Sequence, residues 1–125
     1  MIAGIGMDLI DIARIRRVWT RFGDRFLSRV YQAGEVEYCM AKHDPALSLA
    51  ARFAAKEAAM KALGTGVSRG VSFRQIEVVR RAGEAPTIRF RGRAKERADD
   101  LGVRSASLTI THEAGIAAAV VILEK

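Results

Sequence analysis

The chain has 125 residues, half of them apolar, and its 21 lysines and arginines exceed its 14 aspartates and glutamates by a net charge of +7. This length predicts a single domain over residues 1–125 with a real hydrophobic core. The one cysteine, Cys39, excludes an internal disulfide framework, and the longest uncharged apolar run, 114–123, is too short to span a bilayer. We therefore expect a soluble, cytoplasmic protein that attracts something acidic.

The first half of the chain predicts one strand and three helical segments. Residues 1–10 have the apolar character of a short buried strand, and Asp11 can cap a helix that Gly23 ends. Another helical piece is expected over 34–42. The alanine-rich segment 46–63 predicts the clearest helix, because alanine is the best helix former and a glycine follows it.

The second half of the chain predicts mainly strands. Residues 72–80 and 87–90 are expected to pair through a turn, and a charged helix should follow over 94–101. The segment 105–111 alternates between apolar and polar residues, whereas 115–123 is continuously apolar and is expected to be covered on both faces. Helices and strands mix without strict βαβ alternation, which predicts an α+β fold whose mostly antiparallel sheet packs against the alanine-rich helix.

Two acidic residues are candidates for chemistry. Asp8 ends the first strand, after Gly4 and Gly6, where it could instead cap a helix. Glu57 lies one helical turn before Lys61, with which it could form an ordinary surface ion pair. Mg²⁺ takes one or two protein carboxylates and completes its shell with water and phosphate oxygens. Sequence spacing alone leaves open whether Asp8 and Glu57 meet.

Two further features suggest binding to acidic or phosphorylated molecules. Thr111 and His112 end a predicted strand, where they could contact a phosphate or serve only as structural hydrogen-bonding groups. The helix after Asp11 and the residues beyond it carry a basic stripe flanked by aromatic rings. Charges of this kind steer an acidic helix and rings anchor it, although a solvated face is the alternative. The stripe contains Arg14, Arg17, Arg21, Phe22, Arg25 and Phe26.

Together these residues resemble the bacterial holo-acyl-carrier-protein synthases, the small class of 4′-phosphopantetheinyl transferases. The shared motifs run in order over nearly the whole chain: Gly4-Ile5-Gly6-Met7-Asp8, Gly34-Glu35, the block from Arg52 to Gly66, and Ile110-Thr111-His112. The resemblance implies an enzyme that transfers the 4′-phosphopantetheine of coenzyme A to a serine of an acidic acyl carrier protein, releasing adenosine 3′,5′-bisphosphate, in support of fatty acid biosynthesis. It also implies the family's fold, a Mg²⁺ cofactor, and a homotrimer with active sites between subunits.

The resemblance also implies roles for individual residues. Asp8 and Glu57 match the metal ligands, and together with Lys61 they are the expected catalytic residues. Residues expected around coenzyme A are Arg52, Phe53, Lys61, Gly64, Pro86, Thr111 and His112. Residues expected to dock the carrier protein are Arg14, Arg21, Phe22, Arg25 and Phe26. The chain departs from many relatives in having Glu84-Ala85-Pro86 instead of Gly-Lys-Pro, which removes a lysine contact, and Gly115 where an aromatic residue is common.

Two other classes of protein compete with the enzyme. A nucleic-acid-binding module would explain the basic charge but not Asp8 and Glu57, and the chain has no evident repeats of stacking aromatics. A structural oligomer without chemistry is also compatible with the glycine- and alanine-rich surfaces. We expect neither a nucleic acid nor a membrane as partner. For the enzyme, the base that deprotonates the serine is Glu57 or a metal-bound water aligned by Asp8 or Glu35.

Overall fold

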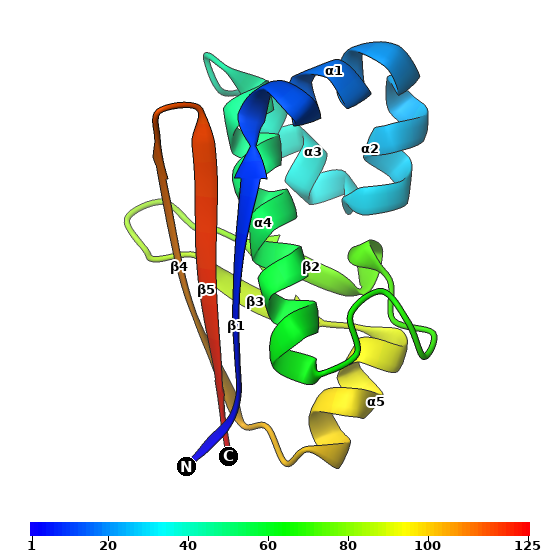
Figure 1. Ribbon diagram of the computed structural model, residues 1–125, viewed down its shortest axis with the longest axis vertical. Helices are drawn as coiled ribbons and strands as arrows, with labels where there is room; N and C mark the ends of the chain where they lie inside the picture. Colours follow the sequence, from blue (N-terminus) through cyan, green and yellow to red (C-terminus); the bar gives the residue numbers. More distant parts are fainter.

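The computed structural model describes all 125 residues and contains five helices, one 3₁₀ turn and five strands. In chain order these are β1 (Ile2–Asp11), α1 (Ile12–Phe22), α2 (Asp24–Val30), α3 (Ala33–Met40), α4 (Pro45–Leu63), η1 (Phe73–Gln75), β2 (Ile76–Val79), β3 (Thr87–Phe90), α5 (Gly92–Asp100), β4 (Ser105–Glu113) and β5 (Ile116–Glu124). Figure 1 shows α4 running beside the long strands, with α1 to α3 near its beginning and α5 near its end.

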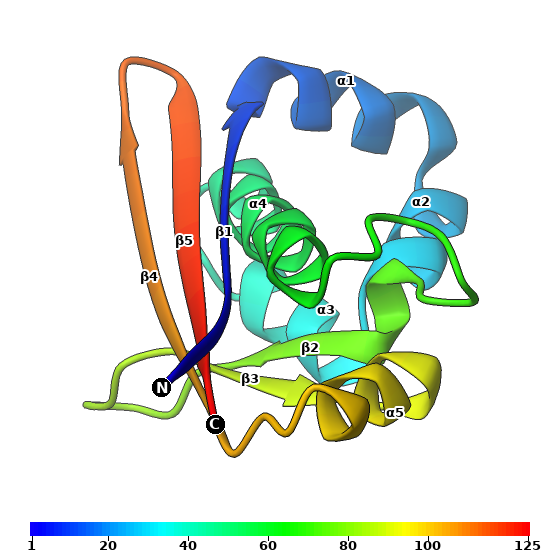
Figure 2. The same cartoon turned by 60° about the horizontal axis from the view of Figure 1, so that its bottom comes forward.

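The strands form two antiparallel sheets. The larger sheet has the order β1-β5-β4, and β2 and β3 form a separate hairpin. Figure 2, in which α4 is seen nearly end-on, shows the helix between the larger sheet on one side and α2 and α3 on the other. This arrangement confirms the predicted α+β fold with an antiparallel sheet packed against the alanine-rich helix.

Glycines on β1 let the strand touch the backbone of α4. A Cβ atom at Gly6 would lie 1.9 Å from the carbonyl oxygen of Ala58, and one at Gly4 would lie 2.0 Å from that of Ala62. No side chain fits in so little space, so glycine is required at both positions. The alanines on α4 serve the same purpose from the helix side, and the contact fixes the position of Asp8 relative to the helix.

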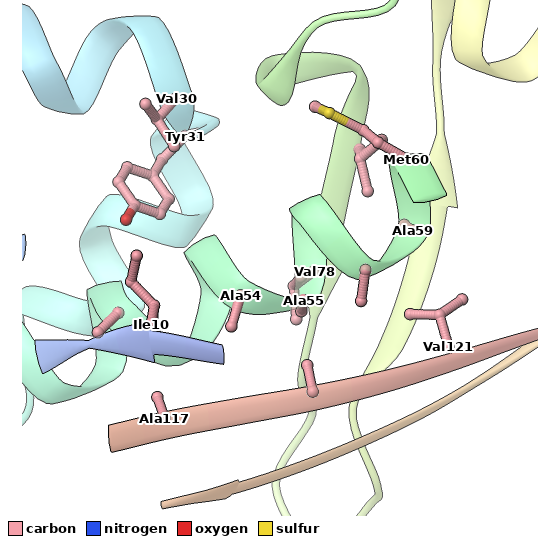
Figure 3. Close-up of a cluster of buried hydrophobic side chains, with 14 of the residues drawn as sticks. Ile10, Val30, Tyr31, Ala54, Ala55, Ala59, Met60, Val78, Ala117 and Val121 are labelled. Carbon is pink, nitrogen blue, oxygen red and sulfur yellow. The ribbon is translucent and has the colours of Figure 1, made fainter. Parts of the chain in front are cut away.

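A continuous core of 25 buried apolar residues connects the sheet, α4 and the remaining helices. Figure 3 shows part of this core, where Ala54 and Ala59 of α4 approach Ile10 on β1 and Ala117 and Val121 on β5. Small side chains on both surfaces allow the helix and sheet to pack closely. No helix in the structure is long and apolar enough to cross a membrane.

Three sequence-based expectations differ from the structure. A helix, α2, follows Gly23 at once, because this glycine adopts a φ of 55° and turns the chain so that Leu27 and Val30 are buried. The strand expected over 72–80 begins only at Ile76, after η1. The prediction that 115–123 is covered on both faces is wrong for the single chain, since the β5 side chains facing away from α4 are only half-buried and no second layer covers them.

Candidate active site

Asp8 lies on the face of β1 that packs against α4, and only 8% of its surface is exposed. The ammonium group of Lys61 donates to Asp8 Oδ1 over 3.0 Å and to the carbonyl oxygen of Met7 over 3.0 Å. The other carboxylate oxygen, Oδ2, is buried and has no hydrogen-bond partner. A buried, unpartnered carboxylate oxygen is costly, so this atom is suited to bind an external cation or donor.

Glu57 is the second carboxylate of the site and lies one turn before Lys61 on α4. Burial and the neighbouring Asp8 carboxylate raise the pKa of Glu57 to about 7, although Lys61 and Arg14 oppose this effect. The structure therefore brings together Asp8, Glu57 and Lys61, and places Arg14 of α1 close enough to act on them. The two carboxylates repel each other when both are ionised, and a proton kept on Glu57 relieves this repulsion.

The residues present fit a divalent cation. Asp8 offers an oxygen without a partner, and Glu57 offers a carboxylate whose ionisation is held back by its surroundings. A bound cation would compensate both charges. No cluster of three or more acidic, histidine or cysteine side chains surrounds the site. Two carboxylates with open positions match Mg²⁺, which keeps several water or phosphate oxygens in its shell, better than a closed structural metal site.

An apolar groove of about 310 Å³ opens beside the aromatic residues of α2 and η1. The ring of Phe53 on α4 stacks on that of Phe73 with centroids 4.9 Å apart, and Phe26 lies 6.5 Å from Phe53. The residues that line the groove are Phe22, Arg25, Phe26, Arg29, Val30 and Phe73. Arg29 and Phe73 were missed from the sequence; Arg29 follows Arg25 by one helical turn and would have been found had α2 been predicted.

Arg21 and Phe22 lie at the end of α1, next to this groove. The guanidinium carbon of Arg21 lies 5.1 Å from the centre of the Phe22 ring, and Phe22 is an exposed large apolar residue. A cation stacked on an exposed ring keeps both groups available to a partner. Three of the predicted docking residues, Phe22, Arg25 and Phe26, thus line one groove, and Arg21 lies beside it through its contact with Phe22.

Arg52 is buried rather than exposed to solvent. Its Nε lies 3.7 Å from Oε2 of Glu35, and its guanidinium carbon lies 4.1 Å from the centre of the Tyr38 ring. Only 5% of the Arg52 surface is accessible, and Nε has no hydrogen-bond partner. The structure therefore places this predicted coenzyme A residue within an internal charge network.

Glu35 and Lys56 form the centre of that network. Lys56 Nζ donates to Glu35 Oε1 over 2.8 Å, and it also donates to the backbone carbonyl oxygens of Phe73 and Ile76. The other oxygen of Glu35 accepts from the amide of Val78. Consecutive residues of a helix point about 100° apart, so the side chains of Lys56 and Glu57 leave α4 in different directions. The ion pair with Lys56 therefore holds Glu35 away from the face of α4 that carries Glu57. With both oxygens engaged in the interior, Glu35 is not placed to align a water at the carboxylate pair.

The remaining predicted site residues lie elsewhere in the chain. Gly64 ends α4 with a φ of 75°, and Pro86 lies in the connection between β2 and β3. Thr111 and His112 are exposed near the end of β4, the strand at the opposite edge of the sheet from β1. Thr111 of β4 and Leu9 of β1 are both paired with Ala118 of β5, so the three residues form one row across the sheet, on the face directed away from α4. Within one chain, Thr111 and His112 therefore do not converge on Asp8 and Glu57, whereas Gly64 follows Lys61 by three residues.

Comparisons with known proteins identify the family of this chain. The family model of the 4′-phosphopantetheinyl transferase superfamily matches residues 4–120. A holo-[acyl-carrier-protein] synthase of Koribacter versatilis is 48% identical over 124 residues, which cover 99% of each chain. The crystal structure of such a synthase from Neisseria meningitidis has a TM-score of 0.90, with 35% identity and full coverage of both chains. A Helicobacter pylori synthase in complex with coenzyme A has a TM-score of 0.84, with 38% identity over 96% of this chain and 99% of the other.

The chain belongs to the 4′-phosphopantetheinyl transferase superfamily, and its full-length relatives place it among the holo-[acyl-carrier-protein] synthases. These matches confirm the predicted family, fold and enzyme class. Coenzyme A is bound in one of these homologous structures, that of the Helicobacter pylori synthase. The roles of the individual residues are proposals, and the geometry above supplies the arguments for them.

Proposed function

We propose that this protein transfers the 4′-phosphopantetheine of coenzyme A to a serine of an apo-acyl carrier protein at a site built around Asp8, Glu57 and Lys61, in support of fatty acid biosynthesis in the cytoplasm. The observation that carries the proposal is the buried, unpartnered Oδ2 of Asp8 next to a second carboxylate and a lysine. A pyrophosphate substrate and its cation would satisfy all three groups. The continuous core supports the view that residues 1–125 act as one domain.

Asp8 and Glu57 would hold Mg²⁺. When bound, this ion supplies positive charge that polarises the pyrophosphate and favours its cleavage. Asp8 also orients Lys61, because Oδ1 and the Met7 carbonyl occupy two of the three ammonium donors. The third donor is free to contact a phosphate oxygen of coenzyme A, and Lys61 is 55% exposed in its side chain. Lys61 thereby stabilises charge on the leaving adenosine bisphosphate.

Glu57 is the proposed general base. A serine hydroxyl must lose its proton as it attacks the phosphorus, and a base works best when its pKa lies near the working pH. Burial and the Asp8 carboxylate raise the pKa of Glu57 to about 7 in the metal-free chain, whereas a bound cation would lower it, so the proposed role of base rests on the position of Glu57 in the carboxylate pair. Phosphorus–oxygen bond formation to the serine and release of adenosine 3′,5′-bisphosphate complete the transfer, with the serine proton on a Glu57 carboxylate oxygen.

An acidic helix of the carrier protein is the proposed occupant of the surface formed by Arg14, Arg21, Phe22, Arg25 and Phe26. The apolar groove beside Phe22 and Phe26 can receive an apolar side chain while the arginines attract the acidic ones. Because Arg14 acts on Glu57, a helix docked here would present its serine next to the carboxylate pair.

A homotrimer is the proposed assembly. On the sheet face directed away from α4, Ile5, Met7 and Leu9 are 63%, 55% and 60% exposed. These side chains are aligned with Ile122, Val120 and Ala118 of β5 and form an apolar surface that is costly to leave in water. Thr111 is exposed on the same surface, so an assembly that covers this face would bury Thr111 as well.

The direct test is transfer itself. The purified protein is incubated with coenzyme A, Mg²⁺ and apo-acyl carrier protein, and the carrier is weighed by mass spectrometry. We expect a mass increase that corresponds to one phosphopantetheine, which disappears when the modified serine of the carrier is replaced by alanine. Absence of transfer to several apo-carrier proteins would contradict the proposal. Sedimentation should give three times the chain mass of 13.7 kDa.

A further inference from the structure

Two arginines of α5 contact the two ends of the loop that follows α4. Arg97 Nε donates to the carbonyl oxygen of Leu63 over 2.9 Å, at the point where the helix ends and the loop begins. Arg93 Nε donates to the carbonyl oxygen of Arg69 over 3.4 Å, close to the other end. The two arginines are four residues apart and share one face of α5, so both reach the same loop. Figures 1 and 2 show α5 beside the end of α4.

The contact made by Arg97 replaces a missing backbone partner. The last carbonyl groups of a helix have no partner within the helix and need one from outside. The amides of Gly64 and Thr65 bond to Lys61 and Met60, which leaves the Leu63 carbonyl to Arg97. A Cβ atom at Gly64 would lie 3.5 Å from an Arg97 terminal nitrogen, so the guanidinium group covers the turn at close range. A cation at a helix C-terminus also interacts favourably with the helix dipole.

The contact made by Arg93 supports a strained part of the loop. Arg69 has a φ of 57°, in the left-handed region that side chains other than glycine rarely adopt. Gly70 follows it, and a Cβ atom there would lie 3.1 Å from the Arg93 side chain. Such a conformation persists only when surrounding contacts enforce it. Gln75 adds a second restraint, since it donates to the Gly70 carbonyl and accepts from the amide of Ala94 on α5.

We propose that Arg93 and Arg97 are positioning residues that hold the loop 64–70 in the conformation that binds coenzyme A. This inference rests on the proposed function, in which Lys61 contacts coenzyme A, and on the family resemblance, which implies that Gly64 lies near the same substrate. The loop begins three residues after Lys61, the proposed phosphate contact, so a change at the Leu63 carbonyl moves Gly64 relative to that lysine. Neither arginine touches the reacting atoms, and they act through the loop backbone.

The test compares Arg97→Ala with Arg97→Lys and Lys95→Ala. Lys95 lies on the same helix but pairs only with Asp99 one turn away, so its replacement is the matched control. For Arg97→Ala we expect the KM for coenzyme A to rise about tenfold, which is the effect expected from losing one hydrogen bond made by a charged group. The kcat and the KM for the carrier protein should be nearly unchanged. Arg97→Lys should recover part of the loss, because an ammonium group can still donate to one carbonyl.

Hydrogen exchange supplies a readout that does not depend on turnover. Amides of residues 64–70 should exchange faster in Arg97→Ala than in the parent protein, while those of α4 and β1 should not change. Arg93→Ala, which releases the other end of the loop, should give the same pattern if Arg97→Ala folds poorly. An unchanged KM for coenzyme A in a well-folded Arg97→Ala, or equal losses in all kinetic parameters, would overturn the inference. If the parent protein transfers nothing, the proposed function fails, whereas loop exchange still tests the restraint by α5.

Discussion

The Glu57→Gln variant in metal-free buffer tests whether burial and Asp8 raise the pKa of Glu57 in the folded protein. The pKa of Glu57 rises from an ordinary value of 4.5 to about 7, first because of burial and then because of Asp8. The folded protein therefore keeps a proton that the unfolded chain releases above about pH 4.5. Stability from this group is fully present below that pH, falls as pH rises towards 7, and is level above it.

The size of the effect follows from the same shift. If the whole pKa shift acted on stability, ionising Glu57 at high pH would lower the free energy of unfolding by at most about 3 kcal/mol. Glu57 is only half-buried and solvent screens part of the interaction, so we expect on the order of 1–2 kcal/mol. Glutamine has the same shape but no charge. In the presence of a chelator, Glu57→Gln should therefore melt about 3–6 °C above the parent protein near pH 8, and at about the same temperature near pH 5.

Thermal unfolding between about pH 5 and pH 9 measures this difference. Glu37→Gln, the same change at an exposed position of α3, should leave the pH dependence of the melting temperature unaltered. Adding Mg²⁺ near pH 8 should stabilise the parent protein and have little effect on Glu57→Gln, because the variant lacks one of the two proposed ligands. Identical pH profiles for the parent and Glu57→Gln would refute the raised pKa of Glu57.

Four other substitutions test separate parts of the structure. Gly6→Ala should prevent the close approach of β1 to α4 and destabilise the protein by several kcal/mol, about 3 or more, as seen by urea unfolding. Lys56→Met removes the closer of the two cations beside the buried Glu35 carboxylate, leaving only Arg52 Nε at 3.7 Å, and should cost about 3–5 kcal/mol in the same assay, whereas a loss below about 1 kcal/mol would contradict the buried ion pair. Ile5→Glu places a charge on the exposed sheet face and should give a monomer in sedimentation experiments; an intact trimer would exclude that face as the interface. Arg21→Glu should weaken carrier-protein binding at least tenfold in calorimetry without changing coenzyme A affinity, and equal loss of both would indicate damage to the fold.

Local sequence signals predicted much of the fold. The alanine-rich segment became α4 because alanine favours helix and because its small side chains allow β1 to pack closely. Gly23 was taken correctly as the end of a helix, yet its left-handed backbone also allowed α2 to begin at the next residue. A seven-residue helix contains too few turns to establish a period of 3.6 residues, so its arginine and aromatic face could not be assigned in full.

Contacts between distant residues account for most of what the sequence did not predict. Glu35 and Lys56 are 21 positions apart, and no spacing rule indicates that one neutralises the other inside the protein. No spacing rule indicates either that Arg52 stacks on the Tyr38 ring beside Glu35. The proximity of Asp8 and Glu57 was predicted from the family resemblance, because the periodicity of the sequence gives no information on contacts between distant residues. The resemblance did not indicate Arg97, whose role depends on the local end of α4.

The contact of Gly4 and Gly6 with α4 has a consequence for how this enzyme can change over evolution. Side chains in most cores can exchange volume with their neighbours, and the elements shift slightly in response. Here the strand meets the helix through backbone atoms, so there is no side chain at the contact whose size could vary. Substitutions elsewhere in the core can therefore accumulate with little movement of Asp8 relative to Glu57. The distance between the two carboxylates is therefore little affected by substitutions in the surrounding sequence. The two strand positions that make this possible accept only glycine.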